Sequence, residues 1–247
     1  MATAKAKPAA KPAVAPEYPE NCPALGYLSF PLWNEADLER LKTWRSEKGH
    51  KPGKYDDRIG GSLFIKQDVV DKVQSYLLKQ FLPFAEAQYA FTDGEKGFDK
   101  ATTKSLAALI ENEDWTELNL PIRDLSDKDI KSLGEDTDYV AKLQFAGSRG
   151  QEIIKKAIAR IDGDLVVVAL SSVPEAGDTD RLWWGSRNIF RAALNMGAYT
   201  REVQVGKDTV VVHGISAYAR QLYLRTDLPM NWGGSDDAQV LEDDFES

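Results

Sequence analysis

The chain has 247 residues, 43% of them hydrophobic, which is enough to bury the core of one domain of roughly 200 residues with tails. One cysteine and two histidines exclude an internal disulfide and a cysteine-based zinc site, and this usage favours a cytoplasmic protein. No stretch approaches the ~20 apolar residues that cross a bilayer, so we expect no membrane association. The net charge of −8, taken alone, argues against nucleic-acid binding.

The charge is unevenly distributed along the chain. Residues 236–247 contain six acidic side chains and no basic one, and residues 93–138 contain thirteen acidic against six basic side chains. Residues 139–225 contain twelve Lys or Arg against eight Asp or Glu, a difference of +4. A basic region beside an acidic tail is typical of a polyanion-binding protein. The alternative is that these segments are solvated faces of an ordinary acidic protein.

The N-terminal part predicts an arm, a strand and a short helix. Residues 1–17 are Ala, Lys and Pro in the main, which predicts a flexible basic arm without the apolar run of a signal peptide. Residues 25–33 are apolar and aromatic and predict a strand, which Pro31 favours placing at a sheet edge. Residues 36–46 have the spacing of a helix.

A strand and a longer helix are predicted next. Residues 60–67 read as a strand, and residues 68–90 carry apolar side chains every three to four positions, as an amphipathic helix does. Asp68 is its expected N-cap, and Pro83 is expected to kink or end it.

Residues 92–138 predict an acidic helical insertion lying across one edge of the core. Helices are expected over 102–112 and 126–133, the second with a capping box formed by Ser126 and Asp129.

From Tyr139 onward the apolar period changes from 3.6 to 2, which indicates strands. Short β runs are expected at 139–145, 157–161, 165–170, 188–194, 200–205 and 209–213, while 215–224 fits a strand or a helix. Tight turns are predicted at Asp162-Gly163-Asp164 and Gly206-Lys207-Asp208. The pattern predicts a mostly β fold with added helices, an elaborated OB-fold barrel spanning 18–228, followed by a disordered acidic tail at 229–247.

The chain lacks the motifs of the common enzyme classes. It has no phosphate-binding glycine loop, no H-E-x-x-H, no G-x-S-x-G and no kinase signature. We therefore expect no enzymatic activity, no cofactor and no bound metal, with a carboxylate-held Mg²⁺ in a nuclease as the remaining enzymatic alternative.

Basic and aromatic side chains alternate in the C-terminal half, as single-stranded nucleic acid requires. Phosphates need cations, and unpaired bases stack on aromatic rings for ~1 to 3 kcal/mol each. The expected DNA-binding residues are Lys142, Arg149, Lys155, Lys156, Arg160, Trp183, Arg187, Arg191, Tyr199, Tyr218 and Arg220. Trp183 is expected to face outward and Trp184 or Phe190 inward, and Tyr218 and Tyr223 fit either the platform or the core.

The tail carries Phe245 among carboxylates, a composition suited to occupying a basic groove or a basic pocket on a partner. Its expected partner-binding residues are Asp236, Asp237, Asp243, Asp244 and Phe245.

The order of these features resembles that of the OB-fold single-stranded DNA-binding proteins of tailed phages, of the T-seven-like replication type. The resemblance covers roughly residues 24–228 and the tail, and its most specific parts are the Gly185-Ser186-Arg187 strand entry and the acidic tail. It implies sequence-tolerant binding of single-stranded DNA, phosphate contacts by Arg187 and Arg191, stacking by Tyr199, and tail contacts with a replicative polymerase and helicase-primase.

The expected function is therefore to coat single-stranded DNA during replication, recombination and repair in the host cytoplasm. The main alternative is a phage structural or assembly protein that does not bind DNA, and a homodimer is left open.

Overall fold

The computed structural model describes residues 14–29, 60–115, 120–134, 137–147, 156–169, 189–205 and 208–225, together with Thr43, Ser46 and Glu47. Within these ranges the strands are β1 (Cys22–Ser29), β2 (Gly60–Lys66), β3 (Ile122–Asp124), β4 (Tyr139–Gly147), β5 (Lys156–Ile161), β6 (Asp164–Ala169), β7 (Ile189–Val205) and β8 (Asp208–Arg225). The helices are α2 (Gln67–Tyr76), the π-helical turn η1 (Leu77–Phe81), α3 (Leu82–Phe91), α4 (Lys100–Glu111) and α5 (Asp127–Leu133).

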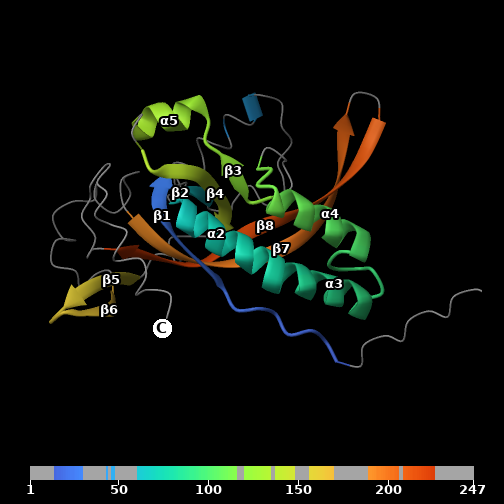
Figure 1. Ribbon diagram of the computed structural model, residues 1–247, viewed down its shortest axis with the longest axis horizontal. Coiled ribbons are helices and arrows are strands. Elements are labelled where there is room, and N and C mark those ends of the chain that lie inside the picture. The colour runs from blue at the N-terminus through green and yellow to red at the C-terminus, as the bar shows by residue number, and fades with distance from the viewer. Residues whose placement is uncertain are drawn as a thin grey trace, which may run out of the picture.

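Five of the strands close into a barrel. The described strands form one sheet in the order β3-β4-β2-β1-β7-β8-β5-β6, and β4 also pairs with β8 in parallel, with Phe145 opposite Ala217. The ring β1-β2-β4-β8-β7 is the connectivity of an OB-type barrel, so the predicted fold class is confirmed. β3, β5 and β6 extend the sheet outside this ring (Figure 1).

The prediction that the first strand lies at an edge is wrong. β1 pairs with β2 on one side and β7 on the other, and Ala24 and Leu28 are fully buried in the core. Pro31, the reason for the prediction, lies beyond Ser29 and so removes no hydrogen bond from this strand. Gly26 allows the close packing here, because a Cβ at this position would lie 2.6 Å from the Phe64 carbonyl oxygen.

The last four predicted β runs are two long strands. β7 has 17 residues and β8 has 18, paired from Phe190–Leu224 to Val205–Asp208, and the strand alternative for 215–224 is confirmed. Asn195, Gly197 and Ala198, which are polar or small, hide the continuity in the sequence. Figure 1 shows this ribbon running from the barrel past α3 and α4. Of the two predicted turns, the one at Asp162-Gly163 is confirmed, since both residues have the positive φ of a type I′ turn, while Gly206 and Lys207 lie outside the described residues.

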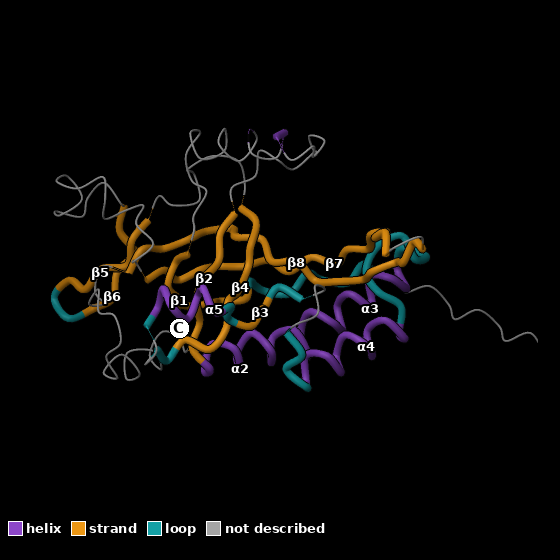
Figure 2. The backbone as a smooth tube through the Cα atoms, turned by 90° about the horizontal axis from the view of Figure 1, so that it is seen from above, coloured by secondary structure: helices purple, strands orange, loops and turns teal. Residues whose placement is uncertain are grey.

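Helices α2, α3 and α4 lie along one side of the strands (Figure 2). The amphipathic helix is confirmed, but Asp68 is not its N-cap, since the cap position is Lys66 and Asp68 lies in the first turn. Pro83 neither ends nor interrupts the helical run. It follows the π-helical turn η1, in which the backbone widens just before the residue that lacks an N–H.

The acidic segment contributes to the same core as the barrel. Its predicted helices and the Ser126–Asp129 capping box are confirmed. Its buried apolar side chains belong to the main cluster: Phe98, Leu106, Ile110, Trp115, Leu120 and Ile122. Among the described elements of this segment, the strand β3 lies at one edge of the sheet, where it pairs with β4. The predicted helix at 36–46 lies outside the described residues except for Thr43 and Ser46, which are helical.

In the part of the chain that the structure describes, no helix combines the length and apolar character needed to cross a membrane.

Candidate nucleic-acid interface

One face of the β7–β8 ribbon carries most of the described residues that the sequence singled out. Alternation sends Phe190, Ala192 and Leu194 of β7 into the core, so their neighbours point outward. We call the outward surface of the two strands the ribbon face, and it carries Arg191, Asn195, Tyr199, Arg201, Ser216, Tyr218, Arg220 and Tyr223. The tyrosines are partly exposed and Arg201 and Arg220 are exposed, as a binding surface requires.

Tyr218 packs closely against Gly197 on the ribbon face. Its ring covers Gly197, because a Cβ at position 197 would lie 2.8 Å from Tyr218 Cε2. Ser216 Oγ contacts the Tyr218 hydroxyl at 3.0 Å and donates to the Gly197 carbonyl at 3.2 Å. One edge of the ring is therefore held close to the backbone of β7 at Gly197, and the side chain is partly exposed.

A β-bulge directs Arg220 outward. The β7–β8 register shifts between Ala193 and Leu194, and Arg220 is the extra residue of β8. The sequence pattern placed Tyr218, Arg220 and Leu222 on one face, whereas Leu222 is fully buried because the bulge reverses the alternation. With the Asn195 amide oriented to satisfy its neighbours, its oxygen accepts from Arg220 Nε at 2.7 Å and its nitrogen donates to Asn21.

The segment before β1 lies against β7 and α3, and Tyr18 attaches it to both. The Tyr18 hydroxyl donates to the Met196 carbonyl, and its ring meets Phe84 of α3 edge-on at 4.9 Å between centroids. Burial raises the pKa of Tyr18, an effect that its backbone hydrogen bond and nearby Arg220 partly offset. Tyr18 therefore stays a neutral donor next to the arginine.

A second cationic and aromatic group lies further along the ribbon. The Arg201 guanidinium carbon lies 5.6 Å from the centre of the Tyr199 ring, a cation–π arrangement. Burial lowers the pKa of Arg123 on β3. Nearby Tyr199 raises this pKa, and nearby Arg201 lowers it further. Arg201 of the ribbon face therefore contacts Tyr199 directly, and Arg123 of β3 lies within electrostatic reach of both residues.

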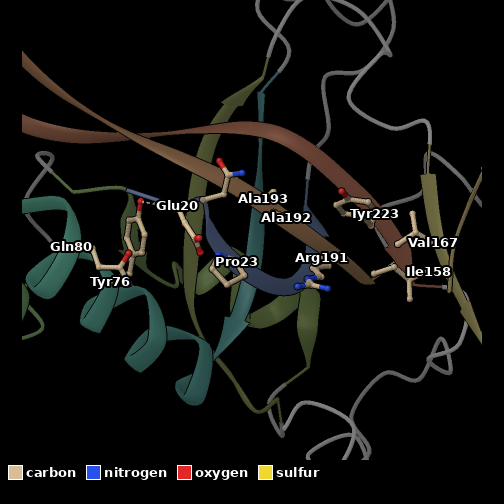
Figure 3. A pocket seen from close by; sticks show the side chains of 11 residues that line it. Glu20, Pro23, Tyr76, Gln80, Ile158, Val167, Arg191, Ala192, Ala193 and Tyr223 are labelled. Atoms are coloured by element: carbon tan, nitrogen blue, oxygen red, sulfur yellow. Dashed lines mark hydrogen bonds between the residues drawn. The ribbon is translucent and has the colours of Figure 1, made fainter. Parts of the chain in front are cut away.

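Arg191 and Tyr223 face each other across the β7–β8 ladder and line a groove of about 660 Å³. Figure 3 shows Arg191 between two ends of this groove. Ile158, Val167 and Tyr223 form the apolar end, and Glu20, Tyr76 and Gln80 form the polar end. The Tyr223 hydroxyl lies 3.1 Å from Gln221 Oε1, which restrains the ring.

The outer face of β1, β2 and β4 also carries aromatic and cationic side chains, but it differs from the ribbon face in their burial and pairing. Tyr27 and Phe64 stack at 6.4 Å between centroids but are only 6% and 3% exposed. Lys66 Nζ lies 3.0 Å from Asp138, and Lys142 Nζ lies 2.8 Å from the buried carboxylate of Asp129. The charge of Lys142, one of the expected DNA ligands, is therefore used to attach α5 to β4.

Several expected site residues cannot be placed on either face. Arg149, Lys155, Trp183 and Arg187 lie outside the described residues, as does the tail with Asp236, Asp237, Asp243, Asp244 and Phe245. Lys156 and Arg160 belong to β5, where only their backbone is described. Of the expected set, the structure brings Arg191, Tyr199, Tyr218 and Arg220 onto one ribbon.

Three residues of this region were not expected: Arg201 and Asn195 on the ribbon face, and Arg123 on β3. Arg201 carried a usable signal, since it lies two residues after Tyr199 in a predicted β region and so on the same face. Asn195 and Arg123 carried none, because the first interrupts an apolar run and the second lies in the acidic segment.

Within the described ranges, no group of three or more His, Cys, Asp or Glu side chains is arranged to hold a metal ion. No protein-family model matches the chain, and no curated protein matches it in sequence.

Proposed function

We propose that this protein binds single-stranded DNA on the ribbon face and coats unwound strands during replication, recombination and repair. The observation that carries the proposal is a contrast in charge pairing between two faces of one barrel. None of Arg191, Arg201 and Arg220 forms an ion pair with a described residue, whereas Lys66 and Lys142 on the other face are both paired with aspartates.

Arginines that form no ion pair with a described residue, on the same strands as partly exposed tyrosines, match the chemistry of a single strand. Each arginine can replace counterions at a phosphate, and each tyrosine offers a sequence-tolerant surface to a base. The OB-type barrel supports the proposal, because barrels of this type bind oligonucleotides on a face flanked by loops and hairpins. Tyr199, Tyr218 and Tyr223 are spread along the ribbon, so a strand lying on it can stack more than one base.

The acidic tail is proposed to compete with DNA for this surface and to recruit replication proteins. Asp236, Asp237, Asp243 and Asp244 supply charges that resemble phosphates, and Phe245 supplies a ring that resembles a base. When DNA displaces the tail, the same residues become available to a basic pocket on a polymerase or helicase-primase.

Fluorescence anisotropy with an oligo-dT of ~30 nucleotides tests the proposal, with affinities measured from low to high salt. We expect salt-sensitive binding that weakens about tenfold in Tyr218→Ala. Replacing the four tail aspartates by Asn, with Phe245→Ala, is expected to strengthen it. Absence of binding by both the wild type and the tail variant at low salt would overturn the proposal.

Assembly without DNA binding is the second candidate, and β6 favours it. Among the described strands β6 pairs only with β5, and its Val166 and Val167 are 39% and 55% exposed. An apolar edge strand is a template for pairing with another chain. Sedimentation velocity separates the two candidates: an assembly protein forms concentration-dependent oligomers and shows no change with oligo-dT.

A further inference from the structure

The groove at Arg191 and Tyr223 differs from the rest of the ribbon face because it is walled. Across it lie Ile158 of β5 and Val167 of β6, which are paired with each other in the β5–β6 hairpin. Tyr223 is aligned with Lys156 of β5, so the hairpin stands directly beside the ring. A flat apolar group that enters this end contacts the ring and is bounded by two aliphatic side chains.

The two charged residues of the groove lie at different positions along it. Arg191 lies in the middle and forms no ion pair with a described residue, whereas Glu20 lies at the far end (Figure 3). The Tyr76 hydroxyl donates to the Glu20 carbonyl at 2.6 Å, and burial raises the pKa of Tyr76, so this hydroxyl stays a donor and fixes the segment. An anion is therefore favoured next to Arg191 and disfavoured at the Glu20 end.

We infer that this groove holds one nucleotide of the bound strand, with its base against Tyr223, Ile158 and Val167 and its phosphate at Arg191. The volume of about 660 Å³ is within the range of small-ligand sites, ~300 to 1,000 Å³. An apolar, aromatic end next to a single cation matches a base joined to a phosphate. This inference rests on the proposed function and adds a second mode, in which one base is enclosed while others stack on the open ribbon.

The test compares a dT15 strand with a 15-unit abasic strand, which keeps the phosphates and lacks the bases. The full-length chain is used as wild type, Tyr223→Ala, Tyr223→Phe and Arg191→Ala. We expect Tyr223→Ala to weaken dT15 binding about tenfold and to leave abasic binding within about twofold. Tyr223→Phe keeps the ring and is expected to match wild type, while Arg191→Ala weakens both strands.

Photocrosslinking keeps the test independent of any folding defect in the variants. Unaltered protein is irradiated with dT15 containing 5-iododeoxyuridine, and the adducts are mapped by mass spectrometry. Adducts at Tyr223 are expected, and adducts confined to the region of Tyr218 and Tyr199 overturn the inference.

The remaining outcomes separate the inference from the proposed function. If Tyr218→Ala weakens dT15 binding and Tyr223→Ala does not, the enclosed nucleotide is wrong and DNA binding stands. If Tyr223→Ala strengthens DNA binding, the groove holds the acidic tail with Phe245, and the nucleotide assignment is overturned. If wild type binds neither strand at low salt, the proposed function fails.

Discussion

Gly197 of β7 lies beneath the ring of Tyr218 of β8, so closely that a methyl group at position 197 would lie 2.8 Å from Tyr218 Cε2. The glycine is required by the ring above it and not by its own backbone, whose φ is not positive. The pair therefore positions an aromatic surface without contributing to the interior of the barrel.

Gly197→Ala is expected to weaken oligo-dT binding severalfold, because the added methyl group lifts the Tyr218 ring from the sheet. The free energy of unfolding should change by less than about 1 kcal/mol, since a ring edge at a partly exposed site can move. Tyr218→Phe is the matched control: it keeps the ring, removes the contact with Ser216 and should bind nearly as wild type. Equal affinities for Gly197→Ala and wild type would show that the ring position does not matter.

Arg220→Ala is expected to reduce the slope of log K against log salt by about 0.7, the amount for one phosphate contact on a single strand. Tyr218→Ala should lower affinity at every salt concentration and leave the slope unchanged, because stacking releases no counterions. Anisotropy titrations at several salt concentrations measure both. A slope unchanged by Arg220→Ala would remove this arginine from the phosphate contacts.

We expect the Asp129–Lys142 pair, which joins α5 to β4, to stabilise the protein less in acid than at neutral pH. Burial alone would raise the pKa of Asp129, but hydrogen bonds from Lys142 and Ser126 outweigh burial and lower it. A carboxyl whose folded pKa lies below its unfolded value of ~3.9 stabilises the protein above that value, and the contribution is lost as the pH falls through the folded pKa.

Asp129→Asn should therefore lower the free energy of unfolding by about 2 kcal/mol at neutral pH and by less in acid. Denaturant titrations at several pH values measure this difference. The DNA affinity of Asp129→Asn should equal that of wild type. A marked change would show that Lys142 contributes to DNA binding.

Gly97 and Gly163 allow the cost of an unfavourable backbone conformation to be measured apart from the cost of a steric clash. Both have positive φ, +88° and +94°. A Cβ at Gly97 would lie 2.1 Å from the Ala85 carbonyl oxygen, whereas a Cβ at Gly163 meets nothing within 4 Å.

Gly163→Ala should cost about 1 kcal/mol for backbone conformation alone, and Gly97→Ala should cost at least about 3 kcal/mol or prevent folding. Thermal unfolding of the two variants measures the difference. Similar costs would mean that the α3–α4 connection can move away from Ala85.

Cys22 should be unreactive in the folded protein. It is 1% exposed, and burial raises the pKa of its thiol to about 12. At about pH 8 the thiolate fraction falls on the order of 1,000-fold relative to an ordinary cysteine, so a disulfide reagent should label the native chain far more slowly than the denatured chain. Equal rates would show that the N-terminal end of β1 opens readily.

The sequence by itself determined the features that depend on neighbours a few positions apart. The Asp162-Gly163 turn, the Ser126–Asp129 capping box, the amphipathic helix and the period-2 runs of the C-terminal half were all predicted, because local hydrogen bonds and side-chain alternation decide them. The sequence also named Arg191 and Tyr199 as candidate ligands, but it placed them in separate segments, and only the structure joins them in one strand.

For the cations whose side chains the structure describes, only the tertiary structure decided which of them form ion pairs. Lys142 and Arg220 look alike in the sequence, yet one meets Asp129 from a helix thirteen residues away and the other is turned outward by a bulge. The central place of β1 likewise depends on its pairing with β7, more than 160 residues later. Contacts between distant segments leave no periodic pattern, so the chain must fold before charge pairing and strand order are fixed.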